Sequence, residues 1–282
     1  MRTLTLCAVR RKLLLAFAAL PPSLAVVFAT AATSAEAQWG RVHDPLLQWS
    51  RDGRPNLFAP APRVKGTPDL SGVWQPDGEP LPPGIEAIEG DLHFPRHMIN
   101  IGADLEGGQP PMQPAAAKLL ETRLGQEGPG AYCKPSGIPH LNAVVLPYKI
   151  VQTPKLVVVM YEENQVFRQI FLDGRKPVEG AVPRWMGYST GHWEGDQLVV
   201  ETTGVTEQSW LDGMGHPHTD RMHVTERFRR RDAGHLEVQI VIDDPGAYTS
   251  PFTYTVKATL VPEDDLLEYF CTENEKDSQH YR

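Results

Sequence analysis

Nine short runs of β-branched and aromatic residues follow one another after Pro139, and they constrain the fold more than any other feature of the chain. Turn residues separate these runs at regular intervals, a pattern typical of antiparallel sheets. The predicted strands are 143–151, 155–162, 165–172, 186–193, 197–203, 221–230, 235–243, 252–261 and 266–272. Tight hairpins predicted at Glu162–Asn164 and Glu194–Asp196 favour a meander.

Two of the predicted strands alternate clearly between apolar and polar residues, so each has one apolar face. The apolar faces consist of Leu236, Val238, Ile240 and Ile242 in one strand and of Tyr254, Val256, Ala258 and Leu260 in the other. A meander of this length can close on itself and so remove its exposed edges. We therefore predict a mainly β fold with a single antiparallel, lipocalin-like (calycin-type) β-barrel. A β-sandwich is the alternative, because strand patterns alone do not separate the two.

The segment before the barrel, residues 38–135, is rich in proline and glycine and cannot hold long regular elements. We expect it to wrap the barrel body, residues 136–282, as an extended chain. Two parts of it are exceptions: Asp69–Trp74 predicts a first strand, and Gln113–Leu124 predicts one short helix that begins just after Pro114.

The first 37 residues have the features of a cleaved export signal. Basic residues precede apolar runs, and Ala35-Glu36-Ala37 forms a cleavage pattern. The alternative is a membrane anchor, but Pro21-Pro22 breaks the apolar stretch. We therefore expect a periplasmic or secreted protein without a stable membrane anchor. Arg10-Arg11 also admits a twin-arginine route.

Export predicts the redox state of the cysteines, and the net charge limits the classes of binding partner. Removal of the signal leaves Cys133 and Cys271, which we expect to form a disulfide in an oxidising compartment, with two buried thiols as the alternative. The net charge of −8 argues against nucleic acid or anionic lipid as the main partner. A small-molecule ligand or substrate remains, and the sequence specifies no oligomeric state.

Several motifs spread over about residues 67–275 resemble those of a widespread family of exported bacterial proteins of uncharacterised function. The matching segments are Thr67–Trp74, Ile150–Pro154, Trp185–Gly187, Gly191–Asp196, His216–His218, Glu226–Phe228 and Asp243–Pro245. The resemblance implies export but no particular chemistry. Barrel decarboxylases of phenolic acids are similar only in the inferred architecture, which is an analogy at the level of the fold.

The loop Gly215–Asp220 concentrates groups capable of chemistry, because it holds two imidazoles and a carboxylate around Pro217. In an extended loop His216 and His218 can point the same way. Together with Asp220, or with His223 or His192, they can form a three-ligand metal site. The alternatives are metal-free catalytic histidines and a purely structural, hydrogen-bonded turn.

Two charged residues alternate with apolar ones, and they lie inside the barrel if those apolar neighbours face inward. Glu226 lies between Val224 and Phe228, and Arg168 lies between Val166 and Ile170. Glu226 is either a general acid or base in a pocket or half of a buried ion pair with an arginine. Arg168 in a pocket would bind a substrate carboxylate.

Three functions follow as hypotheses. The first is a cofactor-independent lyase of decarboxylase type for a small apolar or aromatic acid. In it His216 or His218 moves a proton with Glu226, Tyr148 or Tyr188 binds an oxyanion, and the remaining pocket residues bind substrate. Those substrate-binding residues are Arg168, Arg227, Trp185 and Trp210. The second is a metal-dependent hydrolase in which His216, His218 and Asp220 bind one divalent ion. The third is a non-catalytic carrier of a hydrophobic ligand.

Overall fold

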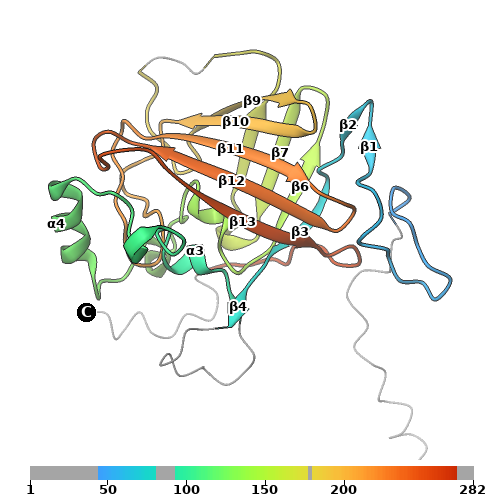
Figure 1. Cartoon of the computed structure of the whole chain (residues 1–282), viewed down its shortest axis with the longest axis horizontal. Coiled ribbons are helices and arrows are strands. Elements are labelled where there is room, and N and C mark those ends of the chain that lie inside the picture. Colours follow the sequence, from blue (N-terminus) through green and yellow to red (C-terminus); the bar gives the residue numbers. More distant parts are fainter. Residues whose placement is uncertain (1–43, 81–92, 177–179, 272–282) are drawn as a thin grey trace, which may run out of the picture. The chain divides into compact units, whose positions relative to one another are not determined.

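Nine strands close into a barrel within the residues that the computed structural model describes, which are 44–80, 93–176 and 180–271. In order around the barrel they are β10 (Gln197–Thr203), β11 (His223–Arg230), β12 (His235–Asp243), β13 (Phe252–Leu260), β3 (Gly72–Pro76), β6 (Tyr148–Gln152), β7 (Leu156–Tyr161), β8 (Phe167–Phe171) and β9 (Tyr188–Glu194). Strands β9 to β13 form the front wall in Figure 1, and β6 and β7 cross behind them. The predicted mainly β barrel is confirmed, and the predicted signal peptide lies outside the described residues.

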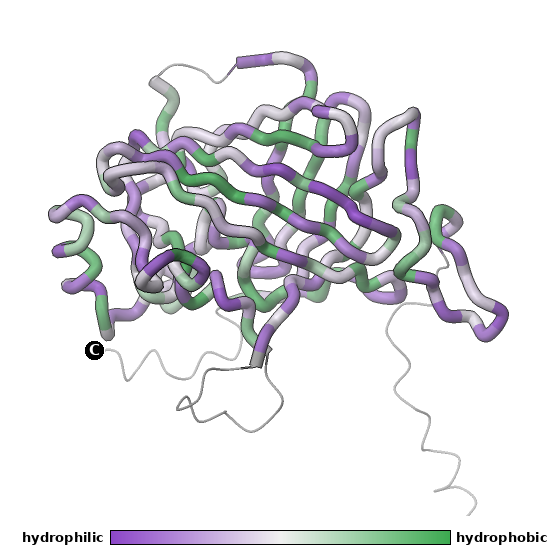
Figure 2. The backbone as a smooth tube through the Cα atoms, in the orientation of Figure 1, coloured by the Kyte–Doolittle hydropathy of each residue, from purple (hydrophilic) through white to green (hydrophobic). Residues whose placement is uncertain are grey.

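The predicted strand faces point as the alternation requires. Every apolar residue predicted to share a face in β12 and β13 is buried, and the residues between them are more exposed. Figure 2 shows this alternation of hydrophobic and hydrophilic residues along the front strands. Burial of these side chains is the main favourable term for closing the barrel.

The strand connections depart from a simple antiparallel meander at two places. Strand β3, from the proline-rich segment, pairs antiparallel with both β13 and β6 and so closes the barrel. Strands β8 and β9 pair in parallel, through only Ile170↔Ser189 and Phe171↔Thr190. The prediction of an all-antiparallel barrel is therefore wrong at this one seam, where a long connection returns the chain in the same direction.

The proline-rich segment contributes the other elements that were expected of it. Helix α4 (Pro114–Arg123) confirms the predicted helix, begins with its proline and buries Ala116 and Leu120. Among the described residues, the other short elements before β6 are β1 (Arg63–Val64), β2 (Thr67–Pro68), β4 (Glu79–Pro80), β5 (His93–Phe94), α3 (Arg96–Ile99), η2 (Glu106–Gly108), η3 (Pro129–Tyr132) and η4 (His140–Asn142).

The hairpins differ in how closely they match prediction. Gly195-Asp196 turns the chain directly between β9 and β10, as predicted, with Gly195 at φ +59°. The β7–β8 connection is looser and contains η5 (Glu163–Gln165). Among the described residues, no helix is long and apolar enough to cross a membrane.

The predicted last strand, 266–272, is wrong over its described part. Leu266–Cys271 has no strand and is held by side chains instead. The backbone N–H of Leu267 donates to Glu162 at 2.9 Å, and Lys149 pairs with Asp265. The expected disulfide joins Cys133 to Cys271 across 138 positions of sequence and ties this segment to the chain between β3 and β6.

Candidate functional site

Arg168 and Glu226 face each other inside the barrel as a fully buried ion pair. Arg168 Nη1 donates to Glu226 Oε1 at 2.9 Å, and Nη2 bonds the other carboxylate oxygen. Ser189 and Thr202 accept the remaining Arg168 hydrogen bonds, at 2.9 and 2.6 Å. Burial alone would lower the pKa of Arg168, but the Glu226 carboxylate outweighs it and raises that pKa.

A further side chain also donates a hydrogen bond to the Glu226 carboxylate. Asn142 Nδ2 donates to Glu226 Oε1 at 2.5 Å, and the Tyr161 hydroxyl donates to the Asn142 side-chain oxygen at 2.8 Å. Both Glu226 oxygens therefore have protein partners, as a buried carboxylate requires. Of the two alternatives for Glu226, this geometry favours the buried ion pair with an arginine.

Tyr148 lies on the inner face of β6 and is fully buried. Its ring centroid is 5.8 Å from that of Tyr161. Burial raises the pKa of the Tyr148 phenol, so the group stays protonated. Its hydroxyl has no hydrogen-bond partner among the described residues. Tyr148 therefore lies near the ion pair without bonding to it.

His216 is fully buried, and each of its two ring nitrogens has a hydrogen-bond partner. Its Nδ1 lies 2.5 Å from Asp212 Oδ2, and its Nε2 lies 3.1 Å from Gln109 Oε1. The Asp212 carboxylate also accepts backbone N–H groups of Ile101, Gly215 and His216, at 2.8 to 3.1 Å. Asp212 thus shapes the histidine loop by capping its backbone.

His218 turns toward a different set of partners. Its Nε2 lies 2.8 Å from Ser209 Oγ, and its Nδ1 lies 3.2 Å from the Thr219 carbonyl. Ser209 is 1% exposed, so this serine and histidine pair has no open face for a substrate. Burial lowers the pKa of His218 and keeps the ring neutral. The loop therefore presents its two histidines to separate environments.

The other residues considered as metal ligands lie outside this loop or at its surface. Asp220 is exposed, while His192 and His223 pair with Glu194 and Glu201. Over residues 44–80, 93–176 and 180–271, no three His, Cys, Asp or Glu side chains are grouped to hold a metal ion. The geometry therefore gives the metal-dependent hypothesis no support.

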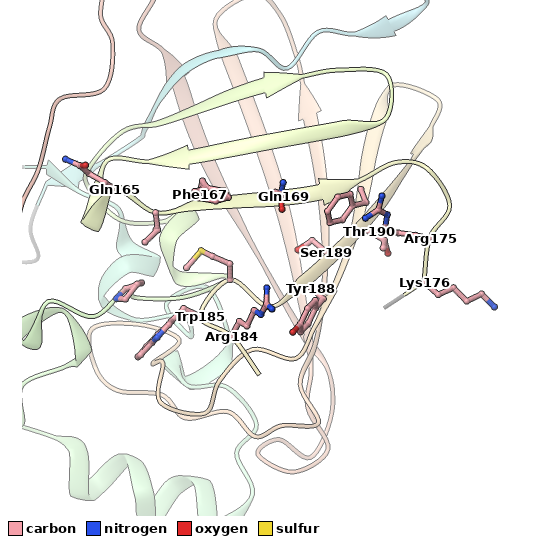
Figure 3. A pocket seen from close by; sticks show the side chains of 15 residues that line it. Gln165, Phe167, Gln169, Arg175, Lys176, Arg184, Trp185, Tyr188, Ser189 and Thr190 are labelled. Carbon is pink, nitrogen blue, oxygen red and sulfur yellow. The ribbon is translucent and has the colours of Figure 1, made fainter. Parts of the chain in front are cut away.

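The seam between β8 and β9 opens on the barrel surface as a cleft of about 670 Å³. Three cations, Arg175, Lys176 and Arg184, line it, and no Asp or Glu is among its described lining residues. Its four aromatic side chains are Phe167, Phe171, Trp185 and Tyr188. In Figure 3, Trp185, Arg184 and Tyr188 lie on the side of the cleft opposite β8.

Backbone contacts fix the wall that carries Arg184. Its N–H donates to Gly204 O at 2.9 Å, and its carbonyl accepts the Thr206 N–H at 3.0 Å. Gly187 has φ +58°, and a Cβ there would lie 2.7 Å from Thr203 O, so only glycine fits this turn. The turn places Tyr188 beneath the guanidinium of Arg184, which lies 5.1 Å from the ring centroid.

The charges in the cleft differ in how they are compensated. Arg175 lies over the Phe171 ring at 3.8 Å and pairs with Asp173, and its hydrogen bonds lower the pKa of that carboxyl to about 2. Arg184 has no carboxylate partner among the described residues. A cation without a counter-ion, next to aromatic rings, suits an anionic ligand.

The cleft reaches the buried ion pair at one residue. Ser189 lines the cleft and also accepts the hydrogen bond from Arg168 Nε. Of the residues predicted to bind substrate or act in catalysis, the structure thus brings Trp185 and Tyr188 into the cleft, with Arg168 directly behind it. The Tyr188 hydroxyl donates to the Val182 carbonyl at 2.9 Å.

Two other predicted substrate-binding residues lie elsewhere. Arg227 pairs with Glu194 at 2.8 Å on the outer face of the barrel. Trp210 packs under the guanidinium of Arg123, 5.1 Å from the ring centroid, and against Gly128. Neither lines the cleft, because the strand order and the path of the long loops decide which side chains meet.

Sequence reasoning missed Arg184, Asn142, Asp212 and Ser209. Asp212 carried a usable signal, since an aspartate three residues before Gly215 is a typical cap for a turn. Asn142, a lone amide beside the apolar run Ala143–Leu146, was a second signal. Arg184 and Ser209 had no such signal, because their roles depend on contacts with other loops and strands that no local pattern predicts. No family model, curated protein or solved structure matches this chain.

Proposed function

We propose that this protein is an exported carrier that binds a small aromatic or apolar carboxylic acid in the cleft between β8 and β9. The observation that carries the proposal is the composition of the cleft: three cationic side chains, four aromatic side chains and no acidic lining residue among those described. Concave sites with an apolar lining and a few polar anchors are the usual form of small-molecule sites.

The cleft offers a partner both to the carboxylate and to the apolar body of such a ligand. Arg184 provides a guanidinium fork for the carboxylate, and Trp185 and Tyr188 provide rings against which an apolar body packs. The backbone bonds around Arg184 hold this wall in place before binding, which lowers the entropy lost on association. The predicted signal peptide and the disulfide both agree with a carrier outside the cytoplasm.

The lyase and hydrolase hypotheses have less support from the geometry. Glu226 is occupied by Arg168 and Asn142, and His216 and His218 are bonded to other partners. None of the three lines the cleft. Turnover of aromatic acids and metal content of the mature protein are the measurements that test these two hypotheses.

Calorimetric titration with 2-naphthoate tests the carrier proposal, with the neutral 2-naphthamide as the matched ligand. We expect the acid to bind at least tenfold more tightly than the amide. In Arg184→Gln the affinity for the acid should fall about tenfold, the lower end of what a charged hydrogen bond contributes, because Arg184 is exposed.

The control is Arg229→Gln, which removes an exposed arginine of β11 that does not line the cleft. It makes the net charge more negative by one unit, as Arg184→Gln does, and should leave the affinity unchanged. Equal binding of acid and amide, or equal loss in both variants, would contradict an anion site at Arg184.

A further inference from the structure

A second pocket, of about 510 Å³, lies on the outer surface beside the cleft. Outward-facing Val158 and Met160 of β7 form its floor, and Leu266 and Leu267 of the C-terminal segment form one wall. Leu267 is 58% exposed although it lines this pocket. The pocket is therefore an apolar surface open to a partner.

The two hollows adjoin. Gln165, Val166 and Phe167 line both of them, at the beginning of β8. Phe167 is 61% exposed and faces outward between the two hollows. A ligand lying across Phe167 can thus contact both, so the cleft and the pocket together make one extended groove.

Charge is distributed unevenly along this groove. The cations lie only at the cleft end, whereas the described charged residues at the pocket end are Glu162 and Glu268. Glu162 is engaged by the Leu267 backbone. An anionic group is therefore attracted to the Arg184 end and repelled from the pocket end, while the apolar floor accepts a hydrocarbon chain.

The pocket wall is held without any sheet hydrogen bonds. The Leu267–Glu162 bond, the Lys149–Asp265 pair and the Cys133–Cys271 disulfide fix it on both sides of Leu266 and Leu267. Cys133 also lies two residues before Pro135, which lines the cleft. The disulfide therefore connects the walls of both halves of the groove.

We propose that the ligand is a linear alkanoic acid, with its carboxylate at Arg184 and its chain crossing Phe167 into the pocket beside Leu267. This inference rests on the proposed carrier function and adds a substrate class and a binding direction. It specifies a free amphipathic acid as the occupant, because the cations are confined to one end of a groove that is apolar at the other.

Titration with alkanoates from butanoate to decanoate, below their micellar concentrations, tests the chain-length dependence. A fully buried methylene contributes about fourfold in affinity, and in a half-open groove we expect about twofold per methylene. Affinity that does not change between hexanoate and decanoate overturns the inference. Binding of 2-naphthoate reports on the cleft alone, so its persistence separates this failure from that of the carrier proposal.

Leu267→Ser tests the position of the chain. We expect it to weaken decanoate about fivefold and to leave 2-naphthoate unchanged, whereas Arg184→Gln weakens both. The control is Val151→Ser, which removes an apolar side chain that is 39% exposed on β6 and lines neither hollow. Equal effects of the two serine variants on decanoate overturn the proposed position.

Vesicles of anionic phospholipid distinguish a free acid from a membrane surface. We expect decanoate to bind in solution and the protein to remain in the supernatant when the vesicles are sedimented. Sedimentation with the vesicles, without binding of free decanoate, would assign the groove to a membrane and overturn the proposal.

Discussion

The interior of the barrel and its β8–β9 seam place arginines in opposite situations. Arg168 is buried and bonded to Glu226, Ser189 and Thr202. Its charge is therefore compensated by the protein, and its hydrogen bonds connect neighbouring strands. Arg184 is exposed, fixed through its backbone and without a carboxylate partner among the described residues. The difference shows that a charge on a barrel strand is not by itself a site. An anion-binding site needs a cationic side chain that has no carboxylate partner within the protein.

Glu226→Gln should have the largest effect on stability. It leaves the buried Arg168 without its counter-ion, which typically costs about 3–5 kcal/mol of unfolding free energy. Urea denaturation measures this loss. The double variant Arg168→Met, Glu226→Leu should recover much of it, because no buried charge remains. A stable Glu226→Gln protein that loses ligand binding or turnover would instead place the function inside the barrel.

Replacing Cys133 and Cys271 by serine should have the next largest effect. The disulfide closes a long loop, and its loss should lower the unfolding free energy by about 2–4 kcal/mol. The variant should also lose affinity for decanoate more than for 2-naphthoate, because the Leu266–Leu267 wall is then held less firmly. Equal loss for both ligands would show that the disulfide acts only on global stability.

Acid should destabilise the fold through histidines of the interior. Burial lowers the pKa of His97, His140 and His218, so the folded chain keeps them neutral. The unfolded chain takes up those protons below about pH 6.5, so stability is present above that pH and is lost as the pH falls. Each histidine contributes at most about 1.4 kcal/mol per pH unit.

Urea denaturation at pH 7.5 and pH 5.5 checks this prediction. His218→Gln should reduce the difference between the two pH values. His192→Gln, which changes an exposed histidine of β9, should leave it unaltered. A His218→Gln protein with the full pH dependence would contradict a neutral, buried His218.

The sequence predicted the local features of the fold better than its long-range pairing. Alternation in β12 and β13 grouped the residues that share the buried face, because burial acts on each strand separately. The parallel β8–β9 pair and the insertion of β3 depend on contacts between distant segments, which no local pattern encodes. The apolar residues that predicted a last strand have another role in its described part, because Leu266 and Leu267 line a surface pocket.

The candidate site was predictable only in part for the same reason. Trp185 and Tyr188 were expected in a pocket and lie in the cleft. Glu226 and Arg168 were expected inside only if their apolar neighbours face inward, and their pairing required knowing the order of the strands around the barrel. The composition of the histidine loop indicated a metal or catalytic site. In the structure, however, His216 and His218 bond to separate partners.

The most direct test of ligand binding at the seam is a nitrogen-15 NMR titration of the tryptophan indole signals with 2-naphthoate. Trp185 lines the cleft, while Trp74 is fully buried and donates its indole N–H to Leu70 O at 2.9 Å. Trp185→Phe and Trp74→Phe assign the two signals. We predict that the Trp185 signal shifts and the Trp74 signal stays. A shift of Trp74 with Trp185 unmoved would place the ligand inside the barrel and contradict the account.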